Sequence, residues 1–126
     1  MQLREQPDPS AAHRGEDLST FCPRFKYTIE LIGRRWVGPI IRVLRSQPAR
    51  FNEILAAVPG LSDRLLTERL RELEAEHLVT RSVSDGRPVR VSYELTDSGL
   101  SLMPIIREIS DWSERWVDVK PESARA

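Results

Sequence analysis

Three polar residues, Arg64, Thr67 and Arg71, have the spacing of one helix face, and Ser62 lies at the start of the same segment. Leucines occupy the opposite face, so the polar face is expected to point to solvent. An arginine fork donates paired hydrogen bonds to the edge of guanine, and hydroxyl groups bond to several base edges. Backbone amides at a helix N-terminus also bind phosphate. These residue types in this pattern predict a helix that reads the major groove of DNA.

Two acidic residues in the same segment oppose this interpretation, because carboxylates repel phosphate groups. Asp63 has a structural role available, since a negative charge is favourable in the first turn of a helix. Glu68 and Glu72 are neighbours of Arg71 on a helix, so an ordinary solvated face with ion pairs is the alternative interpretation of these arginines.

Cys22 is the one cysteine of the chain, so an intramolecular disulfide is excluded. Pro23 suits the first position of a helix, which makes Cys22 its expected N-cap. The positive end of the helix dipole and the nearby Arg24 and Lys26 would both favour the reactive thiolate. Cys22 is therefore a candidate sensor of oxidants or electrophiles. The alternative is a small apolar residue buried in a dimer interface.

No grouping that supports catalysis is visible in the sequence. It contains no glycine-rich phosphate loop, nucleophile elbow or paired acid and base, so we expect neither an enzyme nor a bound cofactor. His13 and His77 have no nearby ligand partner, which predicts no metal site. The three tryptophans would most often be core or interface anchors, with the lining of a ligand pocket as the alternative.

The composition is that of one globular domain, and its charge is unevenly distributed. The net charge of the 126 residues is zero, but residues 34–90 hold 11 arginines, no lysine and seven acidic residues. This basic middle segment favours a nucleic-acid partner. No run of 18 apolar residues predicts a membrane span, and residues 1–20 lack the apolar core of a signal peptide. We expect a flexible lead-in at 1–20, an ordered domain at 21–119, a flexible tail at 120–126, and a cytoplasmic location.

Apolar spacing predicts the elements that position these residues. Helices are expected at 22–32, from Gly38-Pro39 to before Pro48, at 52–58, and from Ser62 onward. A β-hairpin is expected at 79–84 and 89–95 around an Asp-Gly turn. One last helix is expected from 96–98, kinked near Pro104. Its apolar residues recur at the 3, 4, 3, 4 spacing of a helix that pairs with another helix.

This order of elements predicts a mainly α fold with a β-hairpin wing, namely a winged helix-turn-helix with extra N- and C-terminal helices. The wing would bring Arg87 and Arg90 to the DNA backbone or minor groove.

Residues 22–116 also resemble the HxlR family of bacterial winged helix-turn-helix regulators. The matching segments are Cys22-Pro23, 31–33 with Trp36, 50–54, 59–62, 66–74 and 87–96, followed by Gly99, Leu102 and Trp112. Gly38-Pro39 departs from the family pattern. The resemblance implies residues 62–71 as the recognition helix and 87–90 as the wing. Arg50, in the matching segment 50–54, is a further candidate DNA contact.

The resemblance further implies a homodimer that binds a palindromic operator on double-stranded DNA. We expect a regulator of transcription, with repression favoured and activation as the alternative. Some members of the family sense oxidants or electrophiles through a cysteine at the position of Cys22. The dimer would be built from the terminal helices through Phe25, Ile29, Leu102, Ile105, Ile109, Trp112 and Trp116. Two alternatives remain: a regulator controlled by a small-molecule ligand at the dimer interface, and a winged-helix module that binds protein.

Overall fold

The computed structural model describes residues 22–119. The lead-in predicted at 1–20 and the tail predicted at 120–126 lie outside this range. The described elements, in chain order, are α1 (Pro23–Ile32), α2 (Val37–Val43), β1 (Ala49–Arg50), α3 (Phe51–Ala57), α4 (Asp63–Ala75), β2 (Val79–Val83), β3 (Val91–Leu95), α5 (Asp97–Ser101) and α6 (Met103–Trp116). The helices predicted at 22–32, at 52–58 and from Ser62 onward are confirmed as α1, α3 and α4, and the predicted hairpin as β2 and β3. The helix predicted from Gly38-Pro39 to before Pro48 is confirmed as α2, but it ends earlier than predicted, at Val43.

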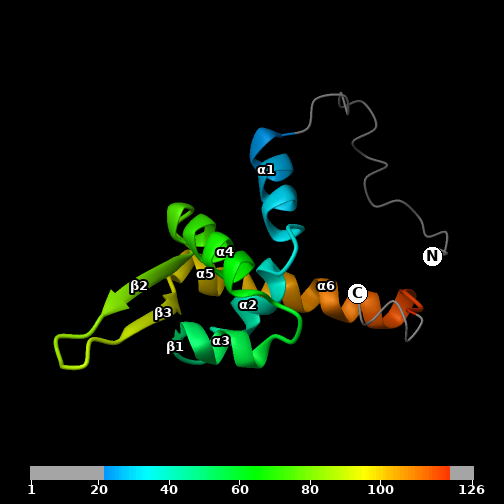
Figure 1. Ribbon diagram of the computed structural model, residues 1–126. Coiled ribbons are helices and arrows are strands. Elements are labelled where there is room, and N and C mark those ends of the chain that lie inside the picture. The colour runs from blue at the N-terminus through cyan, green and yellow to red at the C-terminus, as the bar shows by residue number, and fades with distance from the viewer. Residues whose placement is uncertain (1–21, 120–126) are drawn as a thin grey trace.

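The sheet has three antiparallel strands in the order β1-β3-β2, and β3 lies in the middle. The sequence did not predict β1, because a strand of two residues shows no alternation of polar and apolar side chains. The hairpin extends away from the helices at one end of the molecule (Figure 1). Only Val79 of β2 is buried, so the regular alternation along this strand does not reflect burial beyond its first residue. The wing therefore stands free of the core.

The core is apolar and is built mainly by α2, α3 and α4. Its fully enclosed side chains include Val37, Ile40 and Ile41 of α2, Ile54 of α3, and Leu66, Leu70 and Leu73 of α4. Burying a side chain of this size stabilises the fold by about 1.5–3 kcal/mol. The leucine stripe predicted for the fourth helix is thus the face that holds α4 on the body.

Both ends of α4 are capped. The Ser62 hydroxyl accepts a hydrogen bond from the Leu65 amide at 3.1 Å, as predicted for an N-cap. At the other end, the Leu78 amide bonds to the Leu73 carbonyl and the His77 amide to the Glu74 carbonyl. This is a Schellman motif, in which the residue after the cap adopts a left-handed conformation that glycine usually supplies. Here His77 adopts it, with φ of 59°.

The prediction of a single last helix is wrong, because the chain forms two helices, α5 and α6, which are separated at Leu102. Pro104 lacks an amide hydrogen and its ring would clash with the carbonyl four residues earlier, so α5 cannot continue through it. Pro104 instead occupies the first turn of α6, where a proline is tolerated. Thr96 caps α5, and its hydroxyl accepts a hydrogen bond from the Gly99 amide at 3.2 Å.

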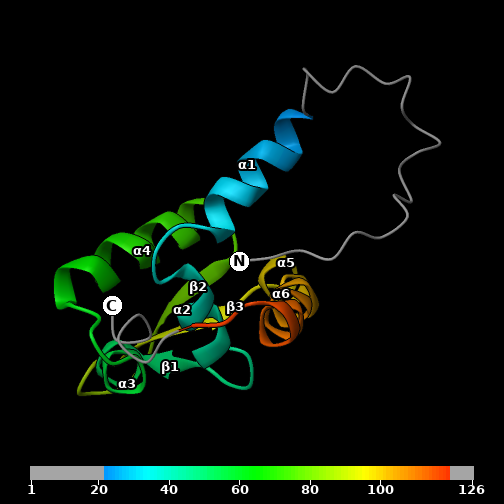
Figure 2. The ribbon, with the colours of Figure 1, turned by 90° about the vertical axis from the view of Figure 1, so that its right-hand side faces the viewer.

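The helices lie on two sides of the sheet and α2. Figure 2 shows α3 and α4 on one side, α5 and α6 on the other, and α1 rising from the body. In Figure 1, α6 extends in the direction opposite to the hairpin. Within residues 22–119, no helix is both long and apolar enough to cross a membrane.

Candidate nucleic-acid interface

The turn between α3 and α4 sets the angle of the two helices. Gly60 has a φ of 90°, which other residues rarely adopt, and its Cα faces the indole ring of Trp36. A Cβ at Gly60 would lie 3.2 Å from that ring, so a larger residue would meet both backbone strain and crowding. The helix-turn-helix therefore rests on an aromatic side chain from the segment before α2.

The start of α3 is fixed by a capping interaction between Arg50 and Glu53. The Glu53 carboxylate accepts hydrogen bonds from the backbone amide of Arg50 at 2.8 Å and from the Arg50 Nε at 3.4 Å. These hydrogen bonds, led by the one from the backbone amide, lower the pKa of Glu53 below its usual value. Arg50 was a candidate DNA contact, and the structure places its guanidinium beside Glu53 at the helix start.

The outward face of α4 carries the predicted recognition residues. The Arg64 side chain is 89% exposed, and its Nε lies 3.4 Å from a Glu68 carboxylate oxygen. An exposed pair of this length contributes little to stability, so Arg64 can exchange Glu68 for another acceptor. The Thr67 hydroxyl donates to the Asp63 carbonyl at 2.8 Å. Arg71 is exposed and forms no ion pair with any residue in the range 22–119.

The third arginine of α4, Arg69, has a different role. Its side chain is only 14% exposed, and it lies 3.2 Å from a Glu72 carboxylate oxygen. Its Nε also donates to the Arg35 carbonyl at 2.8 Å. Glu72 receives a second cation, Arg34, at 3.1 Å. Arg69 therefore ties α4 to the segment between α1 and α2 and is not available to a nucleic acid.

The wing residues Arg87 and Arg90 are exposed in the loop that joins β2 and β3. The backbone amide of Arg90 donates to the Ser84 hydroxyl at 2.9 Å, which closes the loop. Arg81 on β2 is also exposed and belongs to the same projecting hairpin. Arg81 was not among the predicted DNA contacts, because it alternates in phase with Val79 and Val83 and so falls on the face expected to be apolar.

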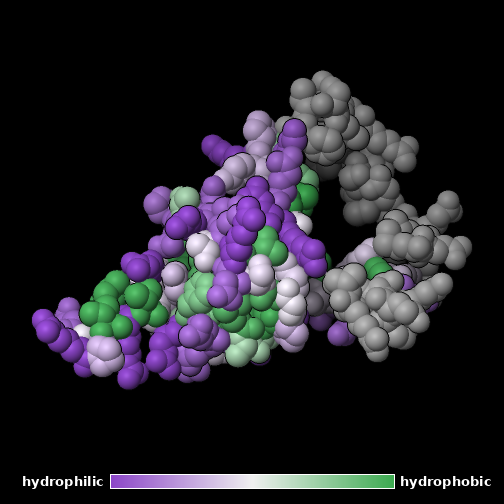
Figure 3. Space-filling model, in the orientation of Figure 1, coloured by the Kyte–Doolittle hydropathy of each residue, from purple (hydrophilic) through white to green (hydrophobic). Residues whose placement is uncertain are grey.

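The surface around α4 is strongly hydrophilic, whereas hydrophobic side chains are visible on the wing (Figure 3). The exposed apolar residues of that hairpin are Val83 and Val89. The wing thus offers both cations and apolar contacts, which is the combination suited to a groove wall with sugar and phosphate groups.

Cys22 is exposed at the N-cap of α1, as the sequence predicts. Helix α1 has no buried residue in this single chain, and Phe25 and Ile29 are about half exposed. Its contact with α4 includes a hydrogen bond from the Tyr27 hydroxyl to the Glu76 carboxylate. That bond raises the pKa of Tyr27 above its usual value, because it stabilises the protonated phenol.

Helix α6 has a similar uncovered apolar face. Ile105, Ile109 and Trp112 are each more than two-fifths exposed. They line a shallow hollow together with Trp116. Leu102, expected on the same stripe, packs against the core of its own chain at the break before α6. Within residues 22–119 there is no cluster of three histidine, cysteine or acidic side chains that could hold a metal ion.

A profile of HxlR-like helix-turn-helix proteins matches residues 31–121 of this chain. The chain belongs to the HxlR-like family. The resemblance found in the sequence is thereby confirmed.

Relatives within the family are described as transcriptional regulators. The uncharacterized HTH-type transcriptional regulator YvaP of Bacillus subtilis (strain 168) is 48% identical over 100 residues, which cover 79% of this chain and 93% of YvaP. YodB of the same organism is 39% identical over 100 residues, which cover 79% of this chain and 89% of YodB.

Solved structures agree with this assignment. The reduced form of YodB matches with a TM-score of 0.73 at 38% identity, over 79% of this chain and 97% of that one. YodB has also been solved after diamide treatment and with quinone bound. The redox regulator HypR in its oxidized form matches with a TM-score of 0.70 at 38% identity, over 78% of this chain and all of that one. This HxlR-like chain is a DNA-binding transcriptional regulator with a winged-helix fold.

Proposed function

We propose that the protein binds a palindromic operator as a homodimer and represses transcription, without enzymatic activity, in the cytoplasm. The observation that carries this proposal is the outward face of α4, where the exposed Arg64 and Arg71 and the half-buried Thr67 lie opposite the buried leucine stripe. A major groove admits one helix, and its base edges are read by side chains of these types. Ser62 lies at the N-terminus of the same helix, and Arg87 and Arg90 of the wing reach the flanking backbone.

The proposed dimer covers the apolar faces of α1 and α6. Phe25 and Ile29 on α1 and Ile105, Ile109 and Trp112 on α6 are each 43–57% exposed. Clusters of exposed large apolar side chains mark interaction sites. Pairing α1 and α6 with a second copy would bury these residues, together with Trp116. In a two-fold dimer, two copies of α4 would enter successive major grooves about 34–36 Å apart, which accounts for a palindromic operator.

Cys22 is the proposed sensor of oxidants or electrophiles. It is exposed at the N-terminus of α1, and α1 meets α4 through Tyr27 and Glu76. A change of α1 after reaction of the thiol would therefore act on the helix that carries the DNA-reading face. The relatives YodB and HypR, solved in reduced and oxidized or quinone-bound forms, support this proposal.

The test of the operator and the dimer is hydroxyl-radical footprinting on a sequence selected from a random DNA library. The proposal expects two protected half-sites related by two-fold symmetry, with centres about 10–10.5 base pairs apart or a multiple of that spacing. Protection of a single asymmetric half-site would contradict the homodimer. Binding to every library sequence with equal affinity would contradict sequence recognition and favour a protein partner for this winged helix.

The test of the sensor compares the parent and Cys22→Ser proteins on the same operator before and after diamide or quinone treatment. We expect treatment to change the affinity of the parent and to leave that of Cys22→Ser unchanged. An equal response of both proteins would exclude Cys22 as the sensor. A ligand-controlled regulator then becomes the leading alternative, and a groove beside α2 favours it.

A further inference from the structure

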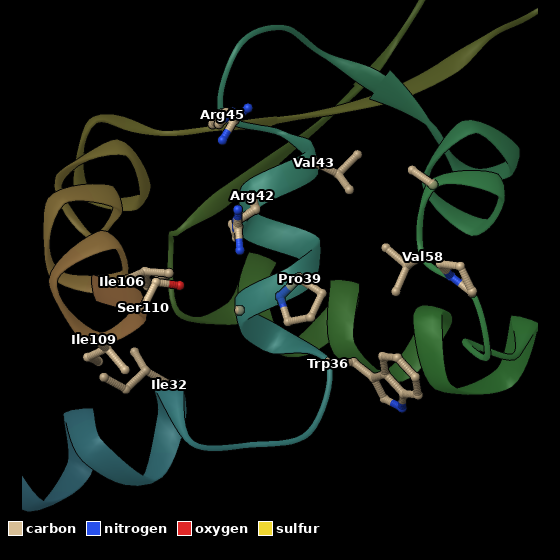
Figure 4. Close-up of a pocket in the computed structure, with 13 residues that line it drawn as sticks. Ile32, Trp36, Pro39, Arg42, Val43, Arg45, Val58, Ile106, Ile109 and Ser110 are labelled. Atoms are coloured by element: carbon tan, nitrogen blue, oxygen red, sulfur yellow. The ribbon is translucent and has the colours of Figure 1, made fainter. Parts of the chain in front are cut away.

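A groove of about 620 Å³ runs over the outer face of α2, between α6 and the end of α3. Figure 4 shows Pro39, Arg42 and Val43 on α2, with α6 residues on one side and Val58 and Trp36 on the other. Ile106, Ile109 and Ser110 form the α6 wall. This volume lies within the range of about 300–1,000 Å³ typical of small-molecule sites.

The groove combines an apolar body with two cations and no acidic residue. Pro39, Val43, Val58 and the two isoleucines of α6 supply apolar surface, and Arg42 and Arg45 supply the charge. Neither arginine forms an ion pair with another residue in the described part of the chain. Asp111 and Glu114 line a neighbouring hollow, which also reaches Arg42 and Arg45, and Asp111 further lines the hollow on α6. Neither acidic residue lines this groove.

These features select a class of ligand. An apolar floor excludes highly polar molecules such as free phosphate or sugars, because it offers too few hydrogen-bond partners to replace water. Two guanidinium groups without a carboxylate favour an anion, and a planar carboxylate accepts paired hydrogen bonds from an arginine fork. The matching ligand is a small amphipathic anion, with a flat apolar body and one carboxylate.

We propose that this groove binds an aromatic carboxylate, whose ring packs on Pro39 and the walls while its carboxylate bonds to Arg42 and Arg45. The ligand would touch α6 through Ile106 and Ile109, and the helix-turn-helix through Val58. It therefore contacts both the helix of the proposed dimer and the unit that reads DNA. Only this regulatory consequence rests on the proposed function; binding itself does not.

Gly38 provides a variant that fills the groove without disturbing the fold. It lies in the first turn of α2 and lines the groove, and a Cβ built on it meets nothing within 4 Å. Gly38→Leu should therefore fold, since leucine favours a helix over glycine, while its side chain occupies the ligand volume. Arg107→Gln is the matched control, because Arg107 lines the neighbouring hollow and does not line this groove.

The experiment is calorimetric titration of the full chain with 2-naphthoate and with the neutral 2-naphthamide. We expect binding of 2-naphthoate, at least tenfold weaker binding of the amide, and at least a tenfold loss in Arg42→Gln and Arg45→Gln proteins. Gly38→Leu should abolish binding, and Arg107→Gln should retain it. Circular dichroism spectra and thermal melts of each variant establish that the fold is intact.

Three results would overturn the proposal: no binding of 2-naphthoate at millimolar concentration, equal binding of acid and amide, or unchanged binding in Gly38→Leu. A parallel titration of labelled operator with and without 2-naphthoate tests the ligand site and the proposed DNA-binding function separately. Binding of 2-naphthoate to a protein that recognises no DNA would support the site and contradict the proposed function. Operator binding without any binding of 2-naphthoate would support the proposed function and contradict the ligand site.

Discussion

Gly99→Ala tests how the wing strand is joined to the C-terminal helices. Gly99 is buried in α5, directly against the backbone of the residue that precedes β2. A Cβ at this position would lie 2.2 Å from the Leu78 carbonyl oxygen and 3.1 Å from a methyl group of Leu95. The same carbonyl accepts a hydrogen bond from the Thr96 amide at 3.0 Å. An added methyl group therefore forces α5 and the start of β2 apart.

The expected cost combines three terms. Overpacking of a tight contact costs about 1–3 kcal/mol, and loss of the Thr96–Leu78 hydrogen bond costs about 1 kcal/mol. The higher helix propensity of alanine returns up to about 1 kcal/mol. We therefore expect the free energy of unfolding to fall by about 1–4 kcal/mol.

The assay is urea unfolding followed by circular dichroism, at one fixed protein concentration because a dimer would make stability depend on it. Gly86→Ala is the matched control, since nothing lies within 4 Å of a Cβ there. We expect that control to be neutral or slightly stabilising, because alanine narrows the unfolded ensemble. A change smaller than about 0.5 kcal/mol for Gly99→Ala would refute the close approach.

Four further substitutions test other parts of the account. Arg71→Ala should weaken specific DNA binding by about 1–3 kcal/mol if its side chain reads a base, whereas Arg87→Ala should weaken binding to all DNA sequences alike and reduce the slope of log affinity against log salt concentration by about 1. Anisotropy titrations at several salt concentrations measure both quantities. An unchanged affinity and an unchanged slope would remove that residue from the interface. His77→Gly should raise the free energy of unfolding by about 1 kcal/mol, because glycine adopts the left-handed conformation at φ of 59° without a Cβ clash; a lower thermal midpoint would contradict this. Glu53→Gln should have a lower free energy of unfolding than the parent at neutral pH. This difference should disappear as the pH falls through the lowered pKa of Glu53, because the charged carboxylate that bonds to Arg50 is then protonated in the parent as well. A difference that persists at pH 2 in parallel urea titrations would show that the carboxylate charge is not its cause.

Local signals in the sequence were sufficient for the helix-turn-helix. Ser62 and the leucine stripe define the start and the buried face of α4, and both depend only on residues close in the chain. The Asp85-Gly86 turn likewise located the wing. By contrast, β1 is too short to show a pattern. The presence of Pro104 predicted a kink, but only the structure shows that the helix breaks at Leu102 into two helices.

The sequence could not distinguish the exposed arginines of α4 from Arg69, which has a structural role. Arg69 and Arg71 are two positions apart and chemically identical, but only Arg69 meets Glu72 and a carbonyl from the segment before α2. The Arg35 carbonyl is 34 residues away in the sequence, so only the packed structure brings it to Arg69. The groove beside α2 was unpredictable for the same reason, since its walls come from three separate segments.

The central claim is that this chain recognises a DNA sequence through α4 and the wing. The most direct measurement is fluorescence anisotropy of the full chain against the DNA upstream of its own gene, with a scrambled duplex as control, at two salt concentrations. The account predicts tighter binding to the upstream sequence than to the scrambled one, and affinity for both that falls as salt rises. Equal affinity for the two duplexes, or binding to neither, would contradict recognition of its own upstream DNA.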